Sequence, residues 1–258
     1  MPRDSIYGGR PLPDFSAQPF DSAPRLLGRS AAFFFLNLPV LAALTLAITI
    51  PGNLLVQGLS YLLDVPSDGI LSYVLLEIGD LVFGTLVAGA VIYAVAGKLR
   101  TGRAPALGES LRWGFRVWLR VLWNEFKAEI TIGLWSLLIF IPGLMALVRL
   151  FLVQPVAALE IDVADPLRRS EELTRGICWR VFFVALPLLV IGLAGSVVIL
   201  GALPGAAESR LLLALADSAL AVAGQWTTVA AVLIYVGQTS KAAQRPKAGA
   251  ATASPDRA

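Results

Sequence analysis

The chain has 258 residues, of which 57% are hydrophobic and only 15% are charged, and its mean hydropathy is +0.73. A soluble domain has about 45–50% apolar and about 25% charged residues, so a water-soluble fold of this length could not hide the excess. The composition therefore predicts a membrane protein. Because the sequence contains no histidine and a single cysteine, Cys178, a disulfide within the chain is excluded and a His/Cys metal site is not expected.

Both ends of the chain differ in composition from its middle. Residues 1–30 are rich in Pro, Gly and Ser and lack helical periodicity, which predicts a disordered cytoplasmic tail. Their long polar lead is not typical of a cleaved signal peptide. Residues 241–258 predict a second disordered cytoplasmic tail, so the membrane domain is expected over 31–240.

Several segments are apolar enough to cross the hydrocarbon, which takes about 20 residues. In chain order the clear ones are 31–50, which is expected to stop at Pro51, then 70–97, 177–202 and 211–238. The segment 121–160 is too long for one span and marginal for two. Pro142 and Gly143 mark its natural turning point.

The positions of arginine and lysine decide how that segment is counted, because these residues accumulate on cytoplasmic loops. They cluster before residue 31, at 98–120, at 168–180 and after 240, whereas the loop 51–69 has none. Two spans joined at Pro142-Gly143 put every arginine-rich segment on one side. We therefore predict an all-α, polytopic helix bundle with six transmembrane helices in a bacterial inner membrane, with both termini cytoplasmic. A re-entrant hairpin over 121–160 is the alternative, because its apolar arms are short.

Two short amphipathic helices are expected on the cytoplasmic side. In the first, Arg112, Arg116 and Arg120 recur every four residues among aromatic side chains. This pattern suits a helix that lies on an anionic membrane surface. In the second, Asp165 is a suitable N-cap and Gly176 a suitable end.

A motif links the doubtful segment to the second of these helices. The run reads IPG-x5-R-x5-P-x4-E from Ile141 to Glu160 and is followed by PLRRSEELTRG and an aromatic-rich span. It resembles the membrane domain attached to some glycerophosphoryl diester phosphodiesterases, and the related six-helix bacterial inner-membrane proteins that stand alone. The matching positions are Pro142, Gly143, Pro155, Glu160, Leu167, Arg168, Arg169, Ser170, Leu173, Thr174 and Gly176. The specific match is confined to this short segment, and the acidic and histidine residues of the phosphodiesterase are absent. The resemblance therefore implies a membrane module and carries no enzymatic activity with it.

Arg149 lies in the middle of the apolar run. An arginine at the centre of a span costs about 2.5–3.5 kcal/mol on insertion scales, so it is expected to face the bundle and find a partner. Counted from the turn at Gly143, Arg149 lies roughly 9 Å below the outer surface. In neighbouring spans Glu77, Asp80 and Asp217 lie roughly 10, 15 and 8 Å deep. The sequence thus predicts a buried charged cluster, with Glu77 and Asp80 the first candidates to pair with Arg149.

Two interpretations of this cluster stay open. The groups can simply pair and stabilise helix packing. Alternatively, three carboxyl groups outnumber one arginine, and the excess must be protonated, solvated by a cavity or matched by a ligand. A cavity or a ligand would make the cluster a binding site.

The sequence shows no nucleophile–base pair, no phosphate loop and no metal-ligand set. The favoured hypothesis is therefore a non-enzymatic integral membrane module that organises lipid or supports a partner protein. Its expected partners are the bilayer, with anionic lipid head groups, and a membrane protein, but no nucleic acid and no cofactor. The alternative is a small transporter or channel that uses the charged layer around Arg149. An intramembrane enzyme is disfavoured.

Overall fold

The computed structural model describes residues 22–65, 69–138, 140–202 and 210–244, and within these ranges the chain forms helices and no strands. The helices are α1 (Ala23–Leu36), α2 (Leu38–Leu62), α3 (Ile70–Thr101), α4 (Leu107–Leu138), α5 (Phe140–Leu150), α6 (Val153–Leu159), α7 (Pro166–Thr174), α8 (Cys178–Ala202) and α9 (Arg210–Gln244). The all-α class expected from the sequence is confirmed for this part of the chain.

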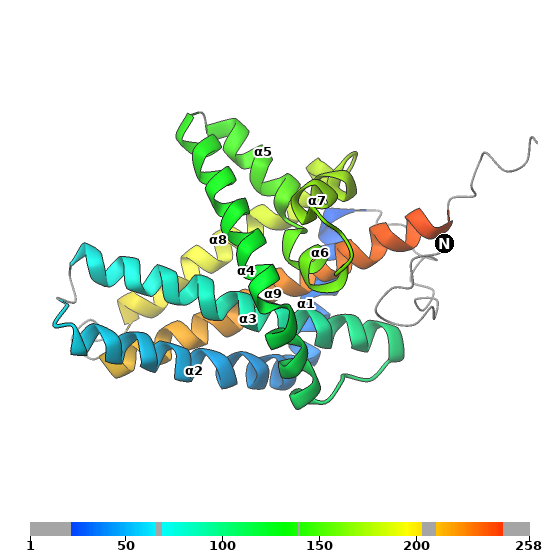
Figure 1. Cartoon of the computed structure of the whole chain (residues 1–258). Coiled ribbons are helices and arrows are strands. Elements are labelled where there is room, and N and C mark those ends of the chain that lie inside the picture. Colours follow the sequence, from blue (N-terminus) through cyan, green and yellow to red (C-terminus); the bar gives the residue numbers. More distant parts are fainter. Residues whose placement is uncertain (1–21, 66–68, 139, 203–209, 245–258) are drawn as a thin grey trace, which may run out of the picture.

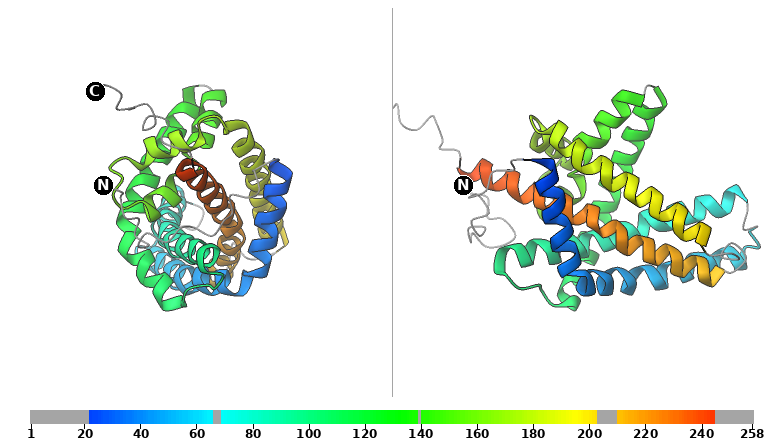
Figure 2. Two further views of the ribbon diagram at one scale, coloured as in Figure 1. Left: turned by 90° about the vertical axis from the view of Figure 1, so that its right-hand side faces the viewer. Right: turned by 180° about the vertical axis from the view of Figure 1, so that it is seen from behind.

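The axes of the four helices α2, α3, α8 and α9 are roughly aligned with one another (Figure 1). Seen end-on, α9 lies in the middle of the assembly (Figure 2). It contacts α1, α2, α3, α6, α7 and α8. Because α9 is covered on several sides, its apolar residues are among the most deeply buried of the protein, with Val229, Ala230 and Val232 fully enclosed.

Among the described residues, five helical stretches are long and apolar enough to cross a membrane: Leu38–Leu62, Ile70–Thr101, Ile141–Leu159, Cys178–Gly195 and Ala214–Lys241. They make this a membrane protein, but the predicted count of six spans is not confirmed. Helix α4 is not among them, because its sequence carries arginines and acids along most of its length. The stretch 141–159 is divided between α5 and α6, which break at Phe151 and Leu152.

The beginning of the membrane domain differs from the prediction. Helix α1 starts at Ala23, inside the segment expected to be a tail, while residues 1–21 lie outside the described part. Helix α2 does not stop at Pro51 but continues through it to Leu62. Gly52 allows a close contact between α2 and α3 at this point, because a Cβ there would lie 2.6 Å from the Phe83 ring. Gly52 is thus a close-packing position within the helix, and the exposed Pro51 beside it does not end the helix.

Helices α4 and α5 form the tight hairpin that the sequence predicts, but with a different turn. Pro142 and Gly143 lie in the first turn of α5, where a proline is tolerated because the N–H groups there have no helical partner. At Gly143 the two arms meet so closely that a Cβ would lie 2.6 Å from the Cα of Ser136. The glycine therefore allows the two arms to pack, and α4 ends at Leu138 and α5 begins at Phe140.

The hairpin also has an orientation that the sequence did not predict. Its arms cross the direction of the four helices α2, α3, α8 and α9 (Figures 1 and 2). Helix α4 packs against α3, while the end of α4 and the start of α5 project beyond the four helices. Helix α5 has 11 residues, which span only roughly 16 Å. Since the hydrocarbon core is about 30 Å thick, α5 alone is too short to cross it.

The second segment for which the sequence predicts a short amphipathic helix forms a helix, α7 (Pro166–Thr174). The Asp165 carboxylate accepts a hydrogen bond from the Arg168 amide at 3.2 Å, as expected of an N-cap. Gly176 follows the helix with φ +85°, a left-handed conformation that favours glycine. On its surface Arg168 forms an ion pair with Glu172 at 3.6 Å. At the other end of the chain, α9 extends to Gln244, into the segment expected to be a tail.

Candidate functional site

A cavity of 560 Å³ lies among α2, α3, α4 and α9, with Gln154 of α6 on its wall. Five carboxyl groups line it: Glu77 and Asp80 from α3, Glu125 and Glu129 from α4, and Asp217 from α9. None of the residues described as lining it is an arginine or a lysine. We call this feature the acidic cavity.

The five acids form a continuous series along the wall. Asp80 lies within electrostatic range of Asp217 on one side and Glu77 on the other. Glu77 in turn interacts with Glu129, and Glu129 with Glu125. The series thus runs from α9 across α3 to α4, and the mutual repulsion of neighbouring carboxylates disfavours the state in which all are ionised without a counter-charge.

Polar neighbours hold two of these acids in place. The Asn53 amide donates to the Asp217 carboxylate at 2.7 Å and to the Ser218 hydroxyl at 3.2 Å, which ties α2 to α9. The Gln154 side chain hydrogen-bonds to Glu125. The other three acids, Glu77, Asp80 and Glu129, are more exposed than Asp217 and Glu125.

Two further groups on the wall have an unused hydrogen-bonding capacity. The Thr49 hydroxyl and the Gln225 carbonyl oxygen are buried and have no hydrogen-bond partner among the described residues. The Gln225 amide nitrogen donates to the Ala221 carbonyl at 3.1 Å, which fixes the side chain and leaves its oxygen as a free acceptor. These two atoms are unsatisfied in the described structure, which costs about 1–3 kcal/mol for each buried polar atom, and the residues that carry them line the cavity.

The structure brings together the three acids that the sequence placed in one layer, Glu77, Asp80 and Asp217, but does not bring Arg149 to them. The Arg149 side chain is exposed and does not line the cavity. Its backbone carbonyl accepts hydrogen bonds from Ser170 at 2.7 Å and Thr174 at 3.3 Å, which dock the end of α5 on α7. The predicted depth of Arg149 assumed that Gly143 lies at the outer surface, and the short, inclined α5 does not satisfy that assumption. The expected pairing of Arg149 with these acids is therefore corrected.

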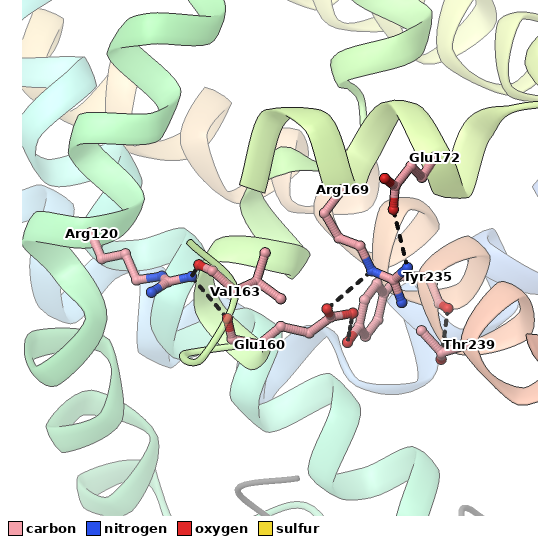
Figure 3. Close-up of polar contacts among 7 residues, drawn as sticks. All are labelled: Arg120, Glu160, Val163, Arg169, Glu172, Tyr235 and Thr239. Carbon is pink, nitrogen blue, oxygen red and sulfur yellow. Dashed lines mark hydrogen bonds and ion pairs between the residues drawn. The ribbon is translucent and has the colours of Figure 1, made fainter. Parts of the chain in front are cut away.

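Two of the motif positions, Glu160 and Arg169, meet where the loop after α6 and helix α7 contact α9 (Figure 3). The Glu160 carboxylate accepts from Arg169 at 3.1 Å and from the Tyr235 hydroxyl at 3.0 Å. Arg169 also forms an ion pair with Glu172 at 3.6 Å. This network connects the loop after α6, helix α7 and helix α9.

Ser170 completes the same docking. Its hydroxyl donates to the Arg149 carbonyl and accepts from the Leu152 amide at 3.2 Å, so it satisfies backbone groups on both sides of the break between α5 and α6. Ser170 and Thr174 are fully buried, and Pro155 and Leu173 are buried beside them. These motif residues hold the α4–α7 segment against the bundle and do not contribute to the wall of the acidic cavity.

Of the three arginines expected at the membrane surface, the structure separates Arg120 from the other two. Arg112 and Arg116 are exposed, and Arg116 lies over the Trp113 ring at 5.5 Å. Arg120 is half-buried and its guanidinium donates to the carbonyls of Glu160, at 2.8 Å, Ile161 and Val163 (Figure 3). Burial lowers the pKa of Arg120 from its usual value, opposed by the charges of Asp162 and Glu160. Arg120 therefore caps the loop after α6 rather than contacting lipid.

Sequence reasoning missed several members of the cavity wall. Glu125 and Glu129 were not among the residues predicted for the charged cluster, because the angle of α4 to the bundle is not encoded in its periodicity. Asn53, Thr49 and Gln225 were not singled out. The only available signal was a polar side chain within an apolar segment, which by itself does not distinguish a binding group from a packing contact.

No family model, no curated protein and no solved structure matches this chain.

Proposed function

We propose that this protein is a non-enzymatic, multi-pass protein of a bacterial inner membrane that binds a small solute in the acidic cavity and carries it across the membrane. The observation behind the proposal is the cavity itself, 560 Å³ in size and lined by five carboxyl groups from three helices. Ionisable residues within membrane segments are costly and mark substrate or ion pathways when they are not internally paired. The described wall supplies no basic residue to pair them.

We further propose a topology of four spans, α2, α3, α8 and α9, with α4 and α5 as a re-entrant hairpin. The N-terminal start of α2 and the C-terminal end of α9 lie at the same end of the bundle (Figure 1). The arginine-rich segments suggest that this end is cytoplasmic. Backbone at membrane depth that is buried against protein or lines a polar cavity is compatible with such a hairpin.

The proposal is tested by solvent access to the cavity. In a Cys178→Ser background, Ala221→Cys places a thiol on the cavity wall, and Ala223→Cys places one on the exposed surface of the same helix, outside the wall. Only a thiol in contact with water ionises and reacts with a charged, membrane-impermeant thiol reagent. We expect Ala221→Cys to react from at least one side of the membrane, and Ala223→Cys, facing lipid, to stay protected. Equal protection of both thiols in intact cells and inverted vesicles would rule out a solvated pathway.

A second candidate function, lipid organisation, is supported by the surface of α4. Arg112 and Arg116 are exposed there together with Phe115, Leu119 and Trp123. Basic residues near the membrane surface attract anionic lipid by about 1 kcal/mol each. If this is the function, Arg112→Gln with Arg116→Gln should reduce the anionic phospholipid retained by the purified protein, measured by native mass spectrometry. Kinship with the phosphodiesterase membrane domains is a proposal that rests on the sequence motif alone.

A further inference from the structure

We infer that the solute of the acidic cavity is an organic cation that carries ammonium groups on an aliphatic chain. This inference rests on the proposed function and names the substrate class of the same site. It follows from the charge of the wall, from the unpaired acceptors and from the way the carboxyl groups are distributed.

The charge of the wall favours a positively charged partner. Asp217, Asp80, Glu77, Glu129 and Glu125 follow one another around the cavity, and no described lining residue is basic. An uncompensated carboxylate away from bulk water is strongly unfavourable. A cationic solute would neutralise several of these groups together, whereas an anionic or neutral solute would leave the repulsion in place.

The unpaired atoms point to a hydrogen-bond donor. The Gln225 carbonyl oxygen and the Thr49 hydroxyl have no hydrogen-bond partner among the described residues, and the two residues, 8% and 5% exposed, line the cavity. These groups are independent of the carboxylates, since they belong to different positions on α9 and α2. A primary ammonium carries three N–H donors and no acceptor, so it can satisfy a carboxylate and such an acceptor together.

The distribution of the acids favours an extended organic cation over a metal ion. Divalent metals such as Ca²⁺ need 6–8 oxygen ligands at about 2.3–2.6 Å, converging on one point. In the part of the chain that the structure describes, no three acids, cysteines or histidines are close enough to hold a metal. The carboxyl groups instead form a series, and Phe83, Leu81 and Phe126 lie on the same wall. Apolar and aromatic surface between spaced charges fits the methylene chain and ammonium groups of an oligoamine.

The test is binding of defined amines to the full-length protein in lipid nanodiscs, measured by isothermal titration calorimetry. Spermidine and putrescine are the probes. 1,4-Butanediol, which keeps the chain length of putrescine without its charges, and Mg²⁺, which keeps two charges without the chain, are the controls. We expect spermidine to bind more tightly than putrescine, and butanediol and Mg²⁺ to bind at least roughly tenfold more weakly than putrescine.

Variants connect that binding to the cavity. Asp80→Asn and Gln225→Leu should each raise the Kd for spermidine roughly tenfold, because the first removes a negative charge and the second removes a carbonyl acceptor. Glu171→Gln, which removes an exposed carboxylate on α7 outside the cavity, should leave the Kd unchanged. Glu129→Gln provides a second exposed cavity variant if Asp80→Asn does not fold.

The outcomes separate the inference from the proposed function. If Mg²⁺ or butanediol binds as well as putrescine, or if Glu171→Gln weakens binding as much as Asp80→Asn, the amine site is overturned. If no amine binds while Ala221→Cys is accessible to the thiol reagent, the inference fails and the proposed function stands. If Ala221→Cys is inaccessible as well, both fail.

Discussion

Ser170→Ala is the substitution that best tests how the α4–α5 hairpin is held against the bundle. The Ser170 hydroxyl donates to the Arg149 carbonyl at 2.7 Å and accepts from the Leu152 amide at 3.2 Å, in a fully buried position. Alanine preserves the helix propensity of α7 and removes only these two bonds.

The magnitude follows from what each backbone group loses. The Leu152 amide loses the Ser170 acceptor, and an unsatisfied buried donor costs about 1–3 kcal/mol. The Arg149 carbonyl keeps the Thr174 hydroxyl at 3.3 Å, so its loss is smaller, about 0.5–1 kcal/mol. Ser170→Ala should therefore lower the free energy of unfolding by about 1.5–4 kcal/mol.

Thr174→Val provides the matched comparison. Alone it should cost less than Ser170→Ala, because Arg149 then keeps its shorter bond to Ser170. In the double variant the Arg149 carbonyl loses both hydroxyls. The loss of unfolding free energy in the double variant should therefore exceed the sum of the losses in the two single variants by about 0.5–1 kcal/mol. This coupling is specific to the shared acceptor.

The assay is reversible unfolding of the purified protein in mixed detergent micelles, followed by circular dichroism and tryptophan fluorescence. A Ser170→Ala protein whose stability lies within about 0.5 kcal/mol of the unmodified protein would refute the docking role, as would strictly additive effects in the double variant.

The other predictions concern the α4–α5 hairpin and the contacts of Arg120 with the loop after α6. Gly143→Ala should lower the free energy of unfolding by about 1–3 kcal/mol in the same assay, because the new Cβ would lie 2.6 Å from the Ser136 Cα. Gly133→Ala is the control and should be neutral or stabilising, since nothing lies within 4 Å of its Cβ. Equal effects of the two substitutions would contradict the close approach at Gly143. Leu138→Cys, in a Cys178→Ser background, should not react with a membrane-impermeant reagent added outside intact cells if the hairpin is re-entrant; ready labelling would restore the six-span topology. Arg120→Gln should lower the free energy of unfolding by about 2–4 kcal/mol because three carbonyls lose a charged donor, while exposed Arg116→Gln should change it by less than about 0.5 kcal/mol. Comparable losses in these two variants would show that Arg120 is not a structural cap.

The sequence alone determined what each segment can bury. Apolar length placed α3 and α8 close to their observed limits, because about 20 apolar residues are needed to cross the hydrocarbon regardless of their neighbours. Local chemistry was equally reliable at α7, where the Asp165 cap and the left-handed Gly176 depend only on nearby backbone. Depth counting along α3 and α9 also predicted that Asp80 and Asp217 belong to one layer of the bundle, and both line the acidic cavity.

Tertiary structure decided the direction of each segment and therefore the membership of the site. Depth can be counted along a helix only when its angle to the membrane is known, and the inclined hairpin moved Arg149 away from the acids while it brought Glu125 and Glu129 to them. That inclination arises from long-range contacts, such as the Ser170 hydroxyl with the Arg149 carbonyl and the Arg120 guanidinium with the loop after α6. Periodicity describes which face of a helix is apolar but not which helix that face will meet, so the acidic cavity emerged only once α4 had been packed against α3.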